Sequence, residues 1–265
     1  MSDPRLAERW ASVRARGRPA LIPYITAGFP DAAATLAMLR GAERAGADIV
    51  ELGVPWSDPV ADGPVIQAST HAALAGGTTL TSVLGLLADA RCAVPVIVFS
   101  YLNPILAMGA SRFARAAKDA GAAGVLVTDL PVGADAALES ELRAPGLPLV
   151  RLIAPTSTPE RTRAIASQSE GFVYLIARTG VTGARTELGA ELKRSVAQVR
   201  AATSLPVAVG FGISAADQAA EVGRVADGVV VGSALVERMR TSGSDAALAW
   251  LAELRAALDG VRRAA

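Results

Sequence analysis

The stretch VPVIVFS, residues 94–100, is rich in branched apolar residues and shows no alternation of apolar and polar side chains. A strand buried on both faces of a parallel sheet has this composition. Seven similar runs are spread along the chain at fairly regular intervals, so eight strands are expected. The other runs cover residues 20–27, 48–52, 124–128, 147–154, 171–176, 205–210 and 228–231.

Alanine-rich stretches with helical spacing lie between these runs. One example is the helix Pro159–Ser167, which Thr158 is expected to open. Eight strands that alternate with helices, without a linker-like segment, predict one α/β domain over residues 1–265. Its expected architecture is a closed (β/α)8 TIM barrel, and a doubly wound open sheet is the alternative.

Extra helices are expected at both ends of this barrel. Residues 3–16 form an amphipathic segment that should pack, as an additional N-terminal helix, against the bottom of the barrel. After the last strand the pattern predicts two helices where one would suffice. The first, over residues 233–240, is short, and the second covers residues 245–258.

Composition excludes several classes of partner and cofactor. The 26 Lys and Arg residues balance 25 Asp and Glu, which argues against nucleic acid or an anionic membrane as the main partner. With Cys92 and His71 as the only Cys and His, a Cys/His zinc centre is excluded and no metal site is expected. Residues 1–10 lack the apolar core of a signal peptide, and no uncharged apolar run reaches the ~20 residues of a membrane span. A cytoplasmic location is therefore expected.

Two glycine-rich turns follow the last two expected strands, GFGIS at residues 210–214 and VGSA at residues 231–234. In a TIM barrel these loops, together with the N-terminus of a short extra helix, commonly bind phosphate through backbone N–H groups. A phosphorylated ligand is therefore predicted. The alternative is that the glycines only serve tight turns, with Ser214 and Asp217 forming a capping-box-like pair at a helix start.

Three acids stand in the stretch VELGVPWSDPVADGP, residues 50–64. Glu51 lies at the C-terminal end of an expected strand, where barrel enzymes place their active sites. Burial raises a carboxyl pKa, so Glu51 is a candidate proton donor and acceptor, or else a structural acid paired with a Lys or Arg. Asp62 follows in a loop flanked by Pro and Gly that reaches the same mouth. Asp58 is equally well explained as an Asp-Pro turn former.

A further loop follows the sixth strand. Residues 177–187 contain two glycines and three threonines without apolar periodicity, which predicts a flexible lid over a ligand; an inconsequential surface loop is the alternative. Tyr174 lies inside the preceding strand. It is either a core residue or a phenol that reaches the cavity.

Four motifs, in order, make the chain similar to the tryptophan synthase α subunit from about Leu21 to Leu258. They are LIPYITAGFPD at residues 21–31, VELGVPWSDPVADGP at 50–64, ARTGVTGA at 177–184 and GFGIS at 210–214. The resemblance implies retro-aldol cleavage of indole-3-glycerol phosphate into indole and glyceraldehyde 3-phosphate, without metal or organic cofactor in this chain. The two catalytic carboxylates of the family correspond to Glu51 and Asp62.

The same resemblance assigns residues to the substrate. Thr182 would meet Asp62 when the lid closes, and Tyr174 would lie near the substrate and Glu51. The phosphate contacts would come from the backbone around Gly183, Gly212, Ile213, Gly232 and Ser233.

The family works as an α2β2 complex with a pyridoxal-phosphate β subunit, which receives the indole through a tunnel. The corresponding contact region includes Pro55, Asp58 and Pro59. Trp56 departs from the family pattern, because a smaller aromatic residue such as Phe or Tyr is usual there. This departure concerns the fit to the partner rather than the cleavage chemistry.

Three other functions remain open at this point. The first is a stand-alone indole-3-glycerol-phosphate lyase with the same chemistry and no obligate partner. The second is another phosphate-binding barrel enzyme, which would usually need different acids or a strand-end lysine, whereas the only lysines, Lys118 and Lys193, lie in helical stretches. The third is an inactive barrel that only activates a partner enzyme.

Overall fold

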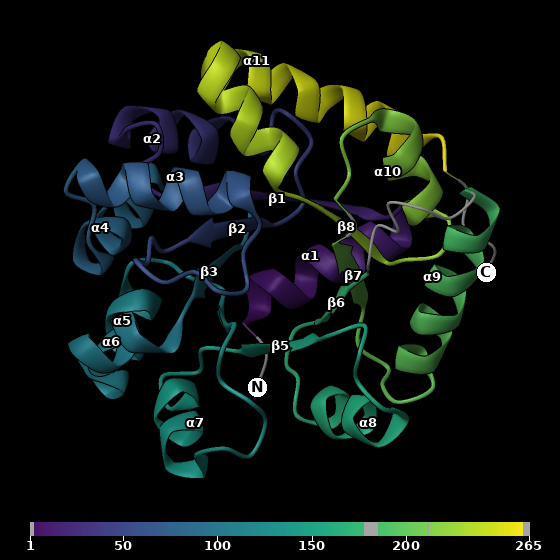
Figure 1. Cartoon of the computed structure of the whole chain (residues 1–265), viewed down its shortest axis with the longest axis horizontal. Helices are drawn as coiled ribbons and strands as arrows, with labels where there is room; N and C mark the ends of the chain where they lie inside the picture. Colours follow the sequence, from purple (N-terminus) through teal and green to yellow (C-terminus); the bar gives the residue numbers. More distant parts are fainter. Residues whose placement is uncertain (1–2, 178–184, 211, 262–265) are drawn as a thin grey trace.

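The computed structural model describes residues 3–177, 185–210 and 212–261. In this part of the chain eight parallel strands pair in sequence order, and β1 pairs with β8 to close the barrel (Figure 1). The predicted TIM barrel is thereby confirmed, and the open sheet is wrong. The strands are β1 Ala20–Thr26, β2 Val50–Gly53, β3 Val96–Ser100, β4 Gly124–Val127, β5 Leu149–Ile153, β6 Val173–Ile176, β7 Val207–Gly210 and β8 Gly228–Val231.

Helices surround the strands as an outer ring (Figure 1). The predicted helix Pro159–Ser167 is confirmed as α8, and the Thr158 side chain accepts a hydrogen bond from the backbone N–H of Arg161 at 3.2 Å. The ring consists of α2 Ala32–Gly41, α3 Pro64–Ala75, α4 Leu80–Ala90, α5 Leu102–Met108, α6 Ala110–Asp119, α7 Ala136–Arg143, α8, α9 Arg185–Arg200, α10 Ala216–Gly223 and α11 Ser233–Asp259.

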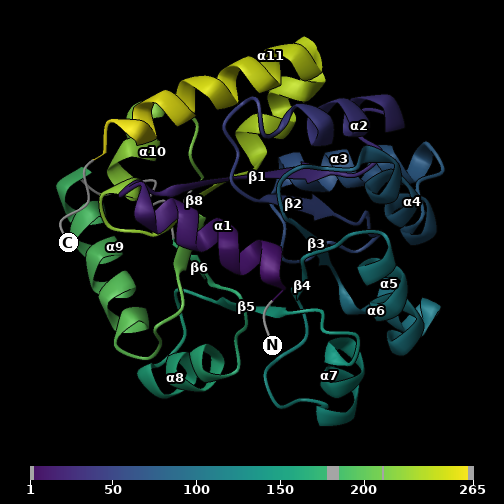
Figure 2. The same cartoon turned by 180° about the vertical axis from the view of Figure 1, so that it is seen from behind.

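The first helix, α1 Pro4–Ala15, lies across one end of the barrel (Figure 2). Asp3 caps it, and its buried residues Leu6, Trp10 and Val13 belong to the same apolar cluster as residues from the strands. The Trp10 ring lies 5.6 Å from that of Phe172, just before β6. The expected N-terminal helix is thus confirmed, and it fills the end of the barrel where the strands begin.

Two helix boundaries test the sequence reading after β7 and β8. The helix α11 is interrupted at Gly243, whose φ of 80° is not helical, so the predicted break between two helices is confirmed. The predicted capping pair of Ser214 and Asp217 is wrong: α10 is capped at Ala215 without a side-chain bond. Instead the longer Gln218 side chain reaches back and accepts from the backbone N–H of Ser214 at 2.9 Å.

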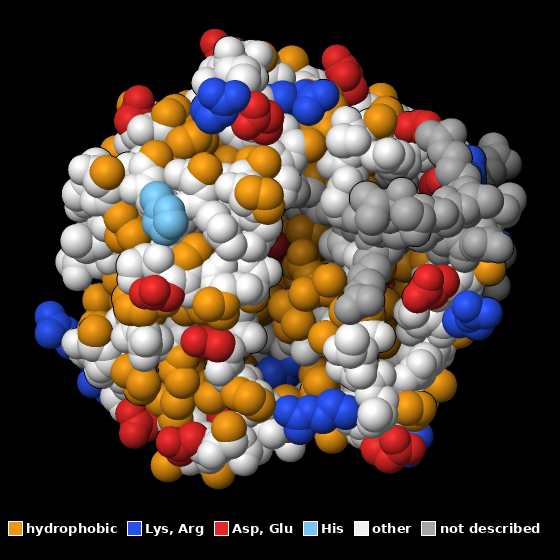
Figure 3. All heavy atoms as spheres, in the orientation of Figure 1, with side chains coloured by type: hydrophobic (Ala, Val, Ile, Leu, Met, Phe, Trp, Pro, Cys, Tyr) orange, Lys and Arg blue, Asp and Glu red, His pale blue; other side chains and the backbone are white. Residues whose placement is uncertain are grey.

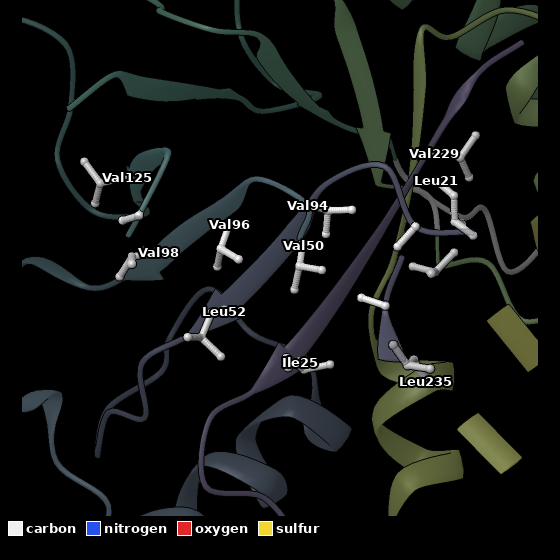
Figure 4. Packing of buried hydrophobic residues seen from close by; sticks show 14 of the residues in the cluster. Leu21, Ile25, Val50, Leu52, Val94, Val96, Val98, Val125, Val229 and Leu235 are labelled. Carbon is white, nitrogen blue, oxygen red and sulfur yellow. The ribbon is translucent and has the colours of Figure 1, made fainter. Parts of the chain in front are cut away.

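Side chains alternate between the two faces of each strand. One set packs outward against the helices, as Val50 and Leu52 do beside Val96 and Val98 (Figure 4). The other set fills the barrel above α1. Its members include Ile22, Ile49, Ile97, Phe172, Ala208 and Val230.

On β1, β2, β3, β6, β7 and β8 the next inward position, two residues further along the chain, lies nearer the C-terminal mouth. These positions are occupied by Tyr24, Glu51, Phe99, Tyr174, Gly210 and Gly232. The mouth therefore combines aromatic rings, one acid and glycines, whereas the layer below it is entirely apolar. This difference positions the functional site.

No single helix in the described residues is long and apolar enough to cross a membrane. One bent pair, α3 with α4, reaches the required length and apolar content only when both segments are taken together.

Candidate active site

A cavity of about 180 Å³ opens at the C-terminal mouth of the barrel. Figure 3 shows this hollow near the centre of the face, between apolar side chains. Both predicted carboxylates contribute to its wall. The described lining residues are Tyr24, Glu51, Ala61, Asp62, Gly63, Ile66, Phe99, Tyr174, Gly210, Gly212, Val230, Gly232 and Ser233.

Glu51 is fully buried on β2, beside Tyr24 of β1 and Ile97 of β3. Neither carboxyl oxygen has a hydrogen-bond partner within the described residues, and no described Lys or Arg pairs with it. Burial therefore acts without compensation and raises the pKa of Glu51 to about 8. The described residues thus give no support to a structural ion pair, and Glu51 holds a proton at neutral pH.

Asp62 lies on the loop between β2 and α3 and is half-buried. The Tyr101 hydroxyl donates to its Oδ2 at 3.0 Å, and the side-chain amide of Gln67 donates to its backbone oxygen at 2.8 Å. Burial raises the pKa of the Asp62 carboxyl, and the bond from Tyr101 opposes that shift. The structure therefore brings Asp62 and Glu51 into one cavity but in different electrostatic surroundings.

Tyr174 reaches the cavity from β6, which answers the question that the sequence left open. Its hydroxyl lies so close to Gly210 of β7 that a Cβ on this glycine would overlap it. Burial raises the pKa of Tyr174, and the charges of Glu51 and Asp62 act in the same direction. The phenol is therefore uncharged at neutral pH.

Three of the predicted phosphate-binding residues, Gly212, Gly232 and Ser233, line the cavity after the ends of β7 and β8. Gly212 has a φ of 64°, a conformation that favours glycine. Ser233 begins α11, so the first N–H groups of that helix have no partner within it. Ile213 is buried in the outer core, which leaves only its backbone for a ligand.

The sequence model that describes the tryptophan synthase alpha chain matches residues 10–260. The chain belongs to the tryptophan synthase alpha chain family. It is a carbon–carbon lyase that cleaves indole-3-glycerol phosphate in the tryptophan synthase reaction.

Individual tryptophan synthase alpha chains agree with this assignment. The chain is 49% identical over 255 residues to that of Gloeobacter violaceus, covering 95% of this chain and 92% of the relative. A solved structure of Mycobacterium tuberculosis tryptophan synthase superposes with a TM-score of 0.88 at 38% identity, covering 98% and 99% of the two chains. The alpha chain of Legionella pneumophila gives the same TM-score at 33% identity, covering 98% of each chain.

Two predicted residues of the alpha chain, Thr182 and Gly183, lie outside the described residues. The expected lid over residues 177–187 is too long, because α9 already begins at Arg185. The sequence of α9 begins with the polar residues Arg185, Thr186 and Glu187. Further along the helix, Leu192 and Val196 are buried. The absence of apolar spacing therefore concealed the start of this helix.

The predicted partner-facing residues of the alpha chain are not equally accessible. Pro55 and Pro59 are buried within the chain, whereas Asp58 is exposed and its Oδ2 accepts a 2.6 Å bond from the hydroxyl of Ser57. Trp56 is half-buried. Val60, 85% exposed, is the most exposed large apolar residue described.

Sequence reasoning missed several residues of this candidate site, among them three whose side chains line the cavity and one, Tyr101, that donates to Asp62. Tyr24 and Phe99 line the cavity at inward strand positions, and their rings meet edge to face at 5.4 Å. Ile66 comes from α3, and Tyr101 follows β3 directly. The two-residue period, counted up from the apolar layer, would have found the first two.

A metal site was not expected in this alpha chain. Over residues 3–177, 185–210 and 212–261, no group of three or more His, Cys, Asp or Glu side chains lies close enough to hold a metal ion. Cys92 is only partly accessible, and its thiol donates to the backbone oxygen of Leu39 at 3.1 Å. His71, on α3, contacts the backbone oxygen of Ser57 at 3.1 Å.

Proposed function

We propose that Glu51 and Asp62 divide the acid–base and electrostatic work of indole-3-glycerol phosphate cleavage. The observation that carries this proposal is the pairing, in one cavity, of a buried carboxyl whose pKa is about 8 with a hydrogen-bonded carboxyl on the adjoining loop. Two carboxyl groups with different environments can take the roles of proton donor and charge acceptor at neutral pH.

Cleavage of the bond between indole C3 and the glycerol chain needs three events. A proton is added to C3, the hydroxyl on the adjacent side-chain carbon loses a proton, and positive character spreads to the ring nitrogen. Protonated Glu51 donates to C3 and its carboxylate then accepts the hydroxyl proton, so the acid is regenerated as the carbon–carbon bond breaks. Asp62 accepts a hydrogen bond from the indole N–H, and this hydrogen bond strengthens as the ring becomes indolenine-like.

The phosphate group is assigned to the turn around Gly212 and to the N-terminus of α11 at Gly232 and Ser233. Free backbone N–H groups and the positive end of the helix dipole favour an anion at this place. Gly183 and Thr182 are assigned to the lid side by family resemblance alone. Tyr174 is assigned to the substrate-binding wall beside Glu51.

We also propose that a β subunit, which would carry the pyridoxal phosphate, binds the rim formed by residues 55–60 in an α2β2 assembly. Asp58 and Val60 are the exposed candidates for direct contact, while buried Pro55 and Pro59 would shape the loop. This chain itself is proposed to need no cofactor. A cytoplasmic location remains the prediction from the sequence.

The decisive assay measures indole release from indole-3-glycerol phosphate by the purified chain, alone and with a tryptophan synthase β subunit. We expect a slow reaction alone and a marked acceleration in the complex. A chain that turns over several times per second alone, with no acceleration, would support the stand-alone lyase. No indole in either condition would contradict the proposed roles.

A further inference from the structure

Tyr101 directs its phenol at the loop that carries Asp62. It follows β3 directly and is 4% exposed. Its hydroxyl donates to Asp62 Oδ2 at 3.0 Å and accepts from the backbone N–H of Ala61 at 3.0 Å. A phenol has a single O–H to donate, so that donor is wholly committed to Asp62.

The bond from Tyr101 has no substitute in the described residues. Gln67 holds the backbone oxygen of Asp62, and the backbone N–H of Asp62 donates to Pro59 at 3.0 Å. These contacts fix the chain path but leave the carboxylate free to rotate. No described residue donates to the second oxygen, Oδ1, which remains available for another donor.

We propose that Tyr101 is the positioning residue for Asp62, holding Oδ2 so that Oδ1 receives the indole N–H. This inference rests on the role proposed above for Asp62. Tyr101 is absent from the described lining of the cavity, so it acts through Asp62 rather than on the substrate. A fixed acceptor avoids reorganisation when the ring nitrogen becomes more acidic during the reaction.

The surroundings of Asp62 supply little other support for its charge. The titratable groups that face it are Tyr24 from β1, Glu51 from β2 and Tyr174 from β6, and burial raises the pKa of each. These groups are neutral at pH 7 and offer no positive charge. On α3, His71 contacts the backbone of Ser57 instead. The hydrogen bond from Tyr101 is therefore the described contact that favours ionised Asp62.

The test is Tyr101→Phe, which removes only the hydroxyl, measured in the full complex. We expect kcat to fall about tenfold with little change in KM, because a hydrogen bond to a charged group is lost. The acidic limb of the kcat/KM profile should move to higher pH. All three tyrosines of the chain lie at this site, so the chain offers no distant tyrosine for a matched control substitution. The Asp62→Asn background serves as the control instead. There Tyr101→Phe should change the rate by less than twofold.

A readout without turnover separates this inference from the catalytic role of Asp62. Carboxyl ¹³C resonances of labelled Asp62 should titrate at higher pH in Tyr101→Phe than in the unmodified chain. An unchanged titration, or equal rate losses in both backgrounds, would overturn the inference. If the Asp62 titration shifts in Tyr101→Phe but the Asp62→Asn variant keeps full activity, only the proposed role of Asp62 is contradicted.

A second substitution keeps the test valid if Tyr101→Phe fails to fold. Difluorotyrosine at position 101 preserves the ring and makes the hydroxyl a stronger donor. The titration of Asp62 should then move to lower pH. No movement, or movement to higher pH, would overturn the inference.

Discussion

Asp48 lies just before β2 and Glu51 lies three residues later, within the strand. They are 1% and 0% exposed and have opposite surroundings. Asp48 accepts from the guanidinium groups of Arg18 at 2.9 Å and Arg255 at 3.2 Å, and from the backbone N–H of Leu21 at 3.0 Å. Glu51 accepts no hydrogen bond from any described residue. The closed end of the barrel thus pairs its buried acid, and the open end does not.

Other buried acids follow the pattern of Asp48. Asp3 pairs with Lys118 at 2.7 Å, and Glu139 with Arg143 at 3.2 Å and with Arg151. A buried charge without a partner is costly, so it is retained only where another requirement outweighs that cost. Pairing therefore separates the acids that hold the fold from the acid that is free to exchange a proton.

The largest expected effect is that of Glu51→Gln. It removes the proton donor and acceptor with little change in volume, so kcat for indole release should fall at least about 10³-fold. Glycerol phosphate binding should persist, and the exposed Glu253→Gln should leave kcat unchanged. Retention of more than a tenth of the rate would sink the assignment.

Asp48→Asn should act on stability instead. Removing its charge leaves Arg255 buried, with Asp259 as its remaining acidic partner among the residues that the structure describes. The free energy of unfolding should fall by about 3 to 5 kcal/mol, while kcat of the folded chain is kept. Urea unfolding measures the loss, and Asp119→Asn on the exposed face of α6 is the control. A loss of activity larger than the loss of folded protein would contradict the distinction between a structural Asp48 and a catalytic Glu51.

Asp62→Asn should lower kcat/KM by a factor that corresponds to roughly 2 to 4 kcal/mol of transition-state stabilisation. The amide keeps the size of the side chain but is a weaker acceptor for the indole N–H. Steady-state kinetics with indole-3-glycerol phosphate measures the effect, with the exposed Asp89→Asn as control. An unchanged kcat would refute the role of Asp62.

The last effect concerns the pH dependence of folding. Glu51 titrates near its ordinary 4.5 in the unfolded chain and near 8 in the folded one, so the folded state binds more protons between these values. Stability therefore falls as pH rises from 4.5 to 8, by at most about 1.4 kcal/mol per pH unit. Glu51→Gln removes this contribution.

The corresponding measurement compares unfolding free energies of Glu51→Gln and the unmodified chain from pH 5.5 to 8.5. The free energy of unfolding of Glu51→Gln should rise relative to that of the unmodified chain up to about pH 8. Above that pH the difference between the two should stay constant. Glu253→Gln should run parallel to the unmodified chain throughout. A constant difference between Glu51→Gln and the unmodified chain would show that Glu51 ionises normally.

Much of the site could be predicted because strand geometry is local. Buried parallel strands have a recognisable composition, and a period of two carries the inward face from Ile49 to Glu51 and from Phe172 to Tyr174. Once the eight runs are recognised, the strand ends mark the mouth. The position of Glu51 therefore follows from its place in one run.

The contacts between loops could not be predicted in the same way. Tyr101 and Asp62 meet because the loops after β3 and β2 converge. The sequence of one loop does not predict the conformation of the other, so this contact could not be expected. Ser214 was misassigned for a related reason: Gln218 and Asp217 were both within reach, and only the folded geometry selects between them.

Closure of the barrel has a consequence for the time course of synthesis. Arg255 lies 207 residues after Asp48, and β1 obtains one of its two neighbours only when β8 has been made. At roughly 5 to 20 residues per second, the ribosome needs roughly 10 to 40 seconds to cover that distance. During this interval β1 presents an open edge, a template for pairing with another chain. The nascent chain is thus most prone to aggregation before its last strand emerges.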